Sequence, residues 1–332
     1  MRYFLATPLL ICYLVFVDKC YAQANVESQR TEFTLPISLM EKMEKVLPPE
    51  WKTQLNQAGV KYYVDSSLSL SGFFSESENS VLTNPLIKGT SLFNRTLAHE
   101  TFHALQFHIH PHEALWIQEG LAEVFETFVV GSMNTNYLQN GLSDLQSDLL
   151  DSEKYEGDEP SLRGHQALFF LYLMTKTNNA QLFWTLATSK NNVFGLDTIK
   201  LAAPASADSR NWLQNMFEQF EISRIHGHMD SSVDPSIDYT LGKISAGIDP
   251  GRYAEDLDTK QIIKRLIKPG SIAFAKDIVK PQLASQIKNK IHIFYLERYY
   301  PYQVIDADLL KGDTTRINSQ PFDTLIVRSL FQ

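Results

Sequence analysis

The chain has 332 residues, of which 44% are hydrophobic and 11% aromatic, so it can bury a substantial core in one large domain or two modest ones. Its formal net charge at pH 7 is -8. This negative charge gives no electrostatic argument for nucleic acid or an anionic membrane surface as the main partner, and we expect no nucleic-acid binding.

Residues 1–24 have the form of a secretory signal peptide. A basic residue precedes an apolar run over residues 4–17, and Ala22-Gln23-Ala24 has the small-x-small form that signal peptidase cleaves. An uncleaved membrane anchor is the alternative, but the run contains Pro8 and is shorter than the roughly 20 residues that cross a bilayer. We therefore expect a mature protein that begins near Asn25, is periplasmic or secreted, and keeps no stable membrane insertion.

Both cysteines of the chain, Cys12 and Cys20, lie inside this segment. The mature protein would then contain no disulfide bond and no thiolate metal site. Any bound metal ion would have to be held by His, Asp or Glu side chains.

The first part of the mature chain predicts helices followed by a small sheet. Apolar spacing indicates a helix from about Leu35, which Pro48-Pro49 ends, and a second short helix around residues 51–55. Runs of β-forming residues then predict strands at residues 60–64, 68–74 and 80–83.

Two amphipathic helices are expected next. The first spans about residues 95–107 and presents His99 and His103 beside an apolar stripe. Pro111 marks its end, because a proline disfavours helical geometry in the residue before it. The second helix spans about residues 113–130, with an apolar face and an acidic face. We expect the acidic face of the second helix to meet the histidine face of the first.

The rest of the chain predicts more helices and then a change of character. The acidic segment 141–159 is interpreted as a loop or exposed helix, and residues 226–251 as a turn-rich connection. The basic residues between positions 260 and 290 are interpreted as a solvated surface rather than a binding patch. Further helices are expected at 162–175, 180–189 and 209–225, and strands at 291–296 and 325–331.

The most informative pattern is His99-Glu100-Thr101-Phe102-His103. Histidines four residues apart share one face of a helix, with about 5–6 Å between their Cβ atoms, so both imidazoles can bind one metal ion. Glu100 then stands beside the ion as a general base. A catalytic zinc ion takes three protein ligands and keeps one position for water, so a third ligand must come from elsewhere in the chain.

The histidine cluster that follows does not supply that ligand in the metzincin arrangement. That arrangement needs glycine at position 106 and histidine at position 109, where this chain has Gln106 and Ile109. His108, His110 and His112 are interpreted as solvated loop residues near the cleft, with an accessory metal site or a pH-sensitive loop as the alternative.

Glu119 is the better third ligand. A carboxylate on the following helix can lie over the histidine face, and Gly120 beside it permits a close helix approach. Glu123, one turn later, is expected to accept a hydrogen bond from a ligand histidine and so fix its tautomer. The reverse assignment, with Glu123 as ligand and Glu119 as support, stays open.

The two motifs together resemble the gluzincin group of zinc metallopeptidases. His99-Glu100-x-x-His103 is followed by Trp116-x-x-Glu119-Gly120-x-Ala122-Glu123, similar to the W-x-x-E-G-x-A-E motif of bacterial peptidase-MA-like proteins. The resemblance covers about residues 60–175. It implies a zincin-like α+β domain, zinc bound by both histidines and Glu119, and Glu100 as the general base.

The chain also departs from this group. Fifteen residues separate His103 from Glu119, fewer than in the thermolysin-like and aminopeptidase branches, and no Gly-x-Met-x-Asn motif precedes the first histidine. Aminopeptidase action is therefore not implied. Gluzincins place a Tyr or His donor near the developing oxyanion, and His165, Tyr155 and Tyr172 are eligible. His165 is favoured, although Tyr172 equally fits a helix core and Tyr155 a loop.

These patterns predict three regions: a signal peptide at 1–24, an α+β zinc metallopeptidase-like domain at 25–225, and a mixed or β-rich C-terminal region of unknown role at 226–332. The expected activity is cleavage of a peptide or protein substrate by an endopeptidase. A zinc hydrolase acting on another bond, or a pseudopeptidase that binds a metal or a partner, are the alternatives. The sequence specifies neither the bond that is cut nor the oligomeric state.

Overall fold

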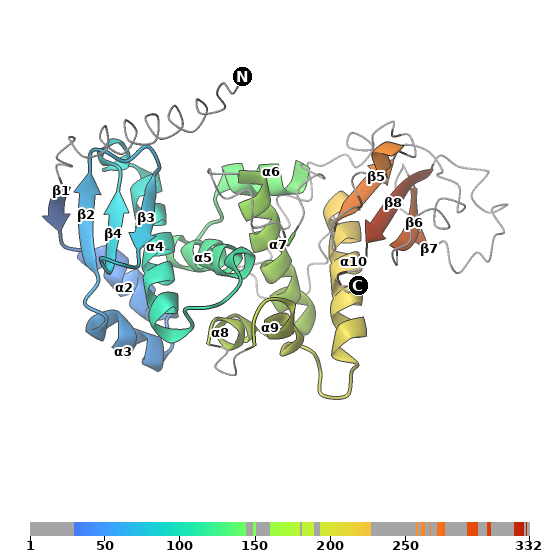
Figure 1. Cartoon of the computed structure of the whole chain (residues 1–332), viewed down its shortest axis with the longest axis horizontal. Helices are drawn as coiled ribbons and strands as arrows, with labels where there is room; N and C mark the ends of the chain where they lie inside the picture. The colour runs from blue at the N-terminus through green and yellow to red at the C-terminus, as the bar shows by residue number, and fades with distance from the viewer. Residues whose placement is uncertain are drawn as a thin grey trace, which may run out of the picture.

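The computed structural model describes residues 30–143, 149–150, 160–179, 181–188 and 193–226, with shorter C-terminal segments at 257, 260–262, 266, 271–275, 291–297, 304–306, 322–328 and 330. The expected signal peptide and nearly all of the expected connection at 226–251 lie outside these residues. The described part is α+β, mostly helical with a small mixed sheet, which confirms the predicted fold class at this level (Figure 1). Among the described residues, no helix combines the length and apolarity needed to span a membrane.

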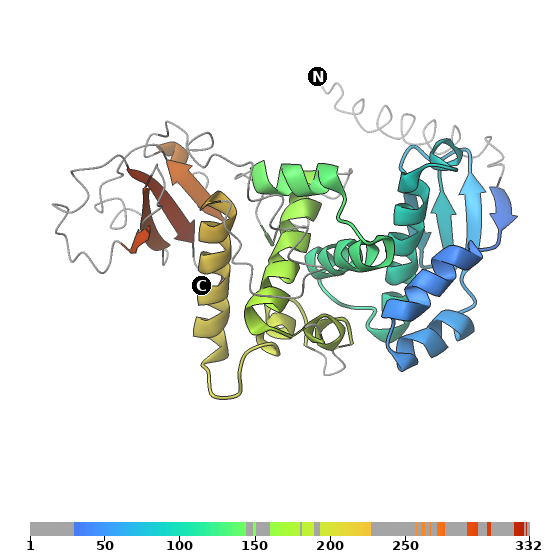
Figure 2. The ribbon, with the colours of Figure 1, turned by 180° about the vertical axis from the view of Figure 1, so that it is seen from behind.

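A four-stranded sheet lies at the N-terminal end of the described structure, with α2 and α3 beside α4 (Figure 2). The strand order is β1-β2-β4-β3, so β3 lies at an edge of the sheet. β2 and β4 are parallel, and the two outer pairs are antiparallel. The predicted helices and strands are present here, and β1 is an additional strand. The elements are β1 (Arg30–Phe33), α2 (Ile37–Val46), α3 (Pro49–Gln57), β2 (Lys61–Asp65), β3 (Gly72–Ser75), β4 (Ser80–Thr83) and the 3-10 helix η1 (Pro85–Ile87).

Helices form the centre of the molecule in Figure 1. The two long helices that the sequence predicts around the motifs are present. The first extends beyond its expected bounds at both ends, and the second begins later than expected. Two short helices, α6 and α9, are additional to the predicted ones, and the end of α6 lies in the segment interpreted as a loop or exposed helix. The helices are α4 (Ser91–Ile109), α5 (Leu115–Val130), α6 (Thr135–Ser143), α7 (Pro160–Thr177), α8 (Leu182–Ala187), α9 (Leu196–Lys200) and α10 (Ser209–His226).

Aromatic packing fixes the orientation of α4, the helix that carries the first motif. Phe102 stacks on Trp51 of α3 with ring centroids 5.4 Å apart and contacts Phe125 of α5 at 5.1 Å. On the sheet side, the Tyr62 and Thr101 hydroxyls of β2 and α4 form a buried hydrogen bond of 3.2 Å. Because the apolar face of α4 is held on both sides, the histidine face is turned towards α5.

Glycines allow α5, α6 and α7 to approach closely. A Cβ atom on Gly120 would lie 2.6 Å from the Phe170 ring, so the close approach expected at this glycine is made to α7. At the crossing of α6 and α7, a Cβ atom on Gly164 would lie 1.7 Å from the carbonyl oxygen of Tyr137, and one on Gly141 would lie 2.4 Å from the Gly164 carbonyl carbon. The crossing therefore sets where the start of α7 stands relative to α5.

The C-terminal region contains a second sheet that packs on α10 (Figure 1). Its strands follow the antiparallel order β5-β8-β6-β7, in the region for which a mixed or β-rich character is expected. Phe294 and Leu325 share a hydrophobic core with Phe217 of α10, and His292 lies 3.1 Å from Glu218. The described strands are β5 (Ile272–Ala275), β6 (Ile291–Glu297), β7 (Val304–Asp306) and β8 (Phe322–Arg328).

Candidate metal centre

Three side chains from α4 and α5 converge on one point. The Nε2 atoms of His99 and His103 are 3.0 Å apart, and the two carboxylate oxygens of Glu119 lie 3.2 Å from His99 Nε2 and 3.5 Å from His103 Nε2. These potential ligand atoms all lie within 4.8 Å of one another. The structure thus brings together the three residues that the sequence predicts as metal ligands.

The spacing of these atoms fits a small tetrahedral ion. Ligand bonds of about 2.0–2.1 Å at a tetrahedral angle place the ligand atoms about 3.3 Å apart. The observed separations of 3.0, 3.2 and 3.5 Å bracket this value. Two imidazoles and a carboxylate suit several divalent cations, so the donor set defines a metal site without fixing the metal.

Glu123 lies on the other edge of the His99 ring. Its Oε1 atom is 3.4 Å from His99 Nδ1, whereas Glu119 faces Nε2. This is the arrangement expected for a carboxylate that supports a ligand histidine, although 3.4 Å is longer than a well-formed hydrogen bond. Glu123 is buried, with a side-chain exposure of 1%.

A second group of possible ligand atoms corresponds to the reverse assignment. His99, Glu123 and Glu126 also lie within 4.8 Å of one another. An arginine already pairs with this group, however, because Arg95 bonds Glu126 at 2.6 Å. A cation among His99, Glu123 and Glu126 would compete with that guanidinium group, so the group with two histidines is the better metal site. Arg163 lies near a carboxylate of each group and does not distinguish them.

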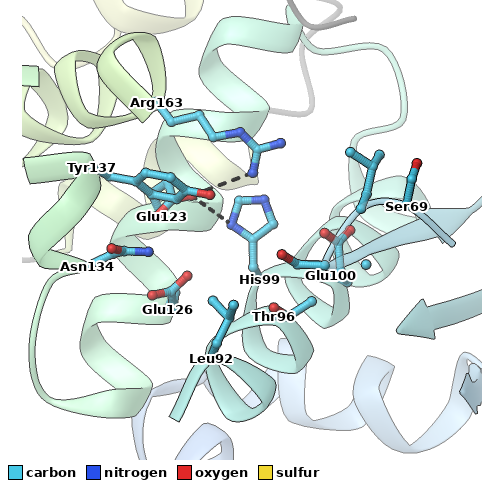
Figure 3. Close-up of a pocket in the computed structure, with 13 residues that line it drawn as sticks. Ser69, Leu92, Thr96, His99, Glu100, Glu123, Glu126, Asn134, Tyr137 and Arg163 are labelled. Atoms are coloured by element: carbon cyan, nitrogen blue, oxygen red, sulfur yellow. Dashed lines mark ion pairs between the residues drawn. The ribbon is translucent and has the colours of Figure 1, made fainter. Parts of the chain in front are cut away.

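One member of the metal group, His99, lines a cleft together with Glu100, Glu123 and Glu126. The cleft encloses about 740 Å³ of non-protein space, part of which is open solvent. Figure 3 shows Glu100 beside His99, and dashed lines that join Glu123 to His99 and to Arg163. The cleft is lined by the segment at the start of β3 (residues 69–72), by α4 and α5, by Tyr137 of α6 and by Arg163 of α7.

The charges of the site stabilise an ionised Glu119. Burial raises the pKa of this carboxyl, but the positive charges of Arg163 and His103 outweigh burial and hold the pKa well below its usual range. Burial lowers the pKa of His103, yet the negative charge of Glu119, and less strongly that of Glu100, raises it above its usual value. Because a metal ligand histidine must be neutral, cation binding would displace a proton from His103.

The residues considered as oxyanion donors lie elsewhere. His165 is buried, stacks on Phe220 and places Nε2 2.7 Å from Glu221, so its imidazole is part of the α7–α10 packing. Tyr172 is also in the core, as its alternative interpretation expected. Tyr155 lies outside the described residues.

The three histidines after the first motif do not enter the metal group. His108 is exposed and lies 3.1 Å from the Asn79 side chain, and His112 is exposed as well. His110 is buried and stacks on Phe194, which contradicts the expectation that it is a solvated loop residue. Its burial follows from aromatic packing beneath the turn that joins α4 to α5.

Sequence reasoning missed two polar residues of the cleft, Arg163 and Tyr137. Arg163 lies near the start of a helix that the sequence predicts, two residues before His165. Tyr137 lies on α6, which has no strong sequence signal of its own. Neither residue has a fixed spacing from the motifs that would have identified it.

Comparison with protein families, with curated proteins and with solved structures gives no match for this chain. We therefore infer function from the geometry of the site and from the resemblance of the two motifs. The resemblance implies a role for each residue, and the geometry must be compatible with that role.

Proposed function

We propose that this protein is an exported zinc-dependent metallopeptidase of the gluzincin type. The observation that supports the proposal is the convergence of His99, His103 and Glu119 at separations suited to one tetrahedral ion, with His99 and Glu100 lining the same cleft. Zinc is proposed because it commonly takes this donor set in hydrolases.

Each side chain then has a distinct task. His99, His103 and Glu119 would hold the ion, and Glu123 would orient the His99 ring through Nδ1. Zinc in such a site supplies Lewis acidity and lowers the pKa of bound water towards about 7. Glu100 accepts the proton of the attacking water and later returns it to the nitrogen of the leaving amine.

A broad peptide-library digest of the mature, zinc-loaded protein tests this function. The parent should cleave peptides, and Glu100→Gln should bind zinc equally but cleave at least a hundredfold more slowly, the usual contribution of a general base or acid. Glu41→Gln, on the exposed side of α2, is the matched control and should behave as the parent.

The outcomes separate this function from its alternatives. Zinc bound without peptide cleavage would favour a hydrolase acting on another bond or a protein that binds without turnover. Equal cleavage by the parent and Glu100→Gln would remove Glu100 from its proposed role. Absence of bound metal in the parent would overturn the proposal altogether.

A further inference from the structure

The cleft contains a cationic side chain beside the metal group. Arg163, in the first turns of α7, places Nη2 3.5 Å from Glu119 Oε2 and Nη1 3.7 Å from Glu123 Oε1. It therefore approaches both the predicted carboxylate ligand and the carboxylate that supports His99. Figure 3 shows its guanidinium above the His99 ring.

The glycine crossing places Arg163 there. Gly164, the next residue, packs so closely on α6 that a Cβ atom would lie 1.7 Å from the Tyr137 carbonyl oxygen. This contact fixes the first turns of α7 over α5 and leaves the Arg163 side chain directed to the cleft, where 21% of it is exposed.

A metal ion would change the electrostatic surroundings of Arg163. Its positive charge faces the carboxylates of Glu119 and Glu123. A bound cation would take up most of the negative charge of Glu119, so the region beside Arg163 would become more positive. A cleft with a divalent cation and an arginine together attracts an anionic oxygen atom.

We propose that Arg163 is a catalytic residue that binds the carbonyl oxygen of the scissile bond as that oxygen becomes negatively charged. This inference rests on the proposed peptidase function. When the water oxygen bonds to the carbonyl carbon, the electron pair of the C=O bond moves to the carbonyl oxygen and the water proton moves to Glu100. When the C–N bond breaks, the pair returns, and Glu100 gives the proton to the amine. Guanidinium suits this oxygen because it stays charged and its donors have a fixed geometry.

Arg95 is a matched control for Arg163. It also pairs with a glutamate of the cleft, at 2.6 Å from Glu126, and it donates further hydrogen bonds to Ser132. Arg95→Gln and Arg163→Gln each remove one positive charge next to a glutamate of the cleft, and the Arg95 contact is the shorter of the two. They differ in whether the charge lies at the metal group.

Acetate binding to the cobalt-substituted protein tests the inference without a known substrate. Cobalt(II) absorption reports an anion that reaches the metal. Arg163→Gln should weaken acetate binding by about ten- to a hundredfold, the worth of a charge-assisted hydrogen bond, while cobalt affinity changes less than tenfold. Arg163→Lys should fall between the parent and Arg163→Gln, and Arg95→Gln should match the parent.

Three results would overturn the inference. If acetate affinity is the same in Arg163→Gln and the parent, Arg163 does not bind anions at the metal. If cobalt affinity falls as much as acetate affinity, Arg163 only positions the ligands. If the parent binds no cobalt or zinc, both the proposed peptidase function and the role of Arg163 fail. If metal binds but Arg163→Gln leaves acetate affinity unchanged, only the role of Arg163 fails.

A peptide found in the library digest extends the test to catalysis. Arg163→Gln should lower kcat by at least tenfold and change KM less than threefold, because the oxyanion exists only in the transition state. A rise in KM with an unchanged kcat would instead identify a contact to the ground-state substrate, such as its terminal carboxylate, and would overturn the assignment.

Discussion

The Oε1 atom of Glu123 lies 3.4 Å from Nδ1 of His99, on the ring edge opposite the nitrogen that faces Glu119. The two glutamates of the second motif, one helical turn apart, therefore address the two nitrogens of one histidine. Glu119 lies where a ligand is needed, and Glu123 lies where a carboxylate can hold the ring and its tautomer. The four-residue spacing of Glu119 and Glu123 is explained by their positions at the two nitrogens of His99.

The two glutamates should differ in their effects on zinc affinity. Glu119→Ala removes a ligand and should weaken zinc binding by more than a hundredfold, whereas Glu123→Ala removes a support and should weaken it by about ten- to a hundredfold. Competition with a chromophoric chelator measures both constants. The opposite order would exchange the roles of Glu119 and Glu123.

Zinc affinity should fall as the pH is lowered through the raised pKa of His103. Burial lowers that pKa, but the neighbouring Glu119 charge raises it above its usual value, so a proton and zinc compete for the imidazole at neutral pH. Titration calorimetry in buffers of different ionisation enthalpy should detect proton release on zinc binding. His108→Ala, which changes an exposed histidine outside the group, should leave that release unchanged.

Gly164→Ala should destabilise the protein by at least about 1–3 kcal/mol, because the added methyl group meets the backbone of α6. Gly120→Ala is the informative comparison. Its methyl group would meet the Phe170 side chain rather than backbone atoms, so its cost should be smaller. Urea unfolding of the two variants measures the difference, and a larger cost at Gly120 would contradict the role given to the α6–α7 crossing.

Acid should weaken the packing of α7 on α10 through Glu221. Burial raises the pKa of this carboxyl, but the charges of Arg224 and His165 lower it below its usual value. A lowered pKa contributes stability at pH values above the unfolded-state pKa, and that contribution is lost as the pH falls through the folded-state pKa.

Glu221→Gln tests this contribution. It leaves Arg224 buried with a neutral partner, so it should cost about 3–5 kcal/mol near pH 7 and flatten the decline in unfolding free energy as the pH falls below the ordinary pKa of a glutamate. Urea unfolding at several pH values measures that slope. An unchanged slope would show that Glu221 is not responsible for the decline.

The local part of the candidate site was accessible from the sequence. His99 and His103 are one turn apart on a helix whose apolar stripe is visible, and the turn at Pro111 brings Glu119 back over them after a short connection. These relationships depend on helical periodicity and a short loop, which a single sequence carries.

The remaining part depends on contacts between distant elements. Arg163 reaches the cleft because Gly141 and Gly164 allow α6 to cross α7, and a close approach of two glycines leaves no periodic pattern. His165 looked suitable as a polar residue near a helix start, but its environment is set by Phe220 and Glu221 on α10, more than 50 residues later. Tertiary packing determines both outcomes.

Anomalous X-ray diffraction at the zinc absorption edge, from crystals grown with zinc, would show whether His99, His103 and Glu119 bind one zinc ion. We expect one strong peak in contact with Nε2 of His99, Nε2 of His103 and the carboxylate of Glu119, with Glu123 still at Nδ1 of His99. A peak among His99, Glu123 and Glu126, or no peak within reach of the two histidines, would contradict it.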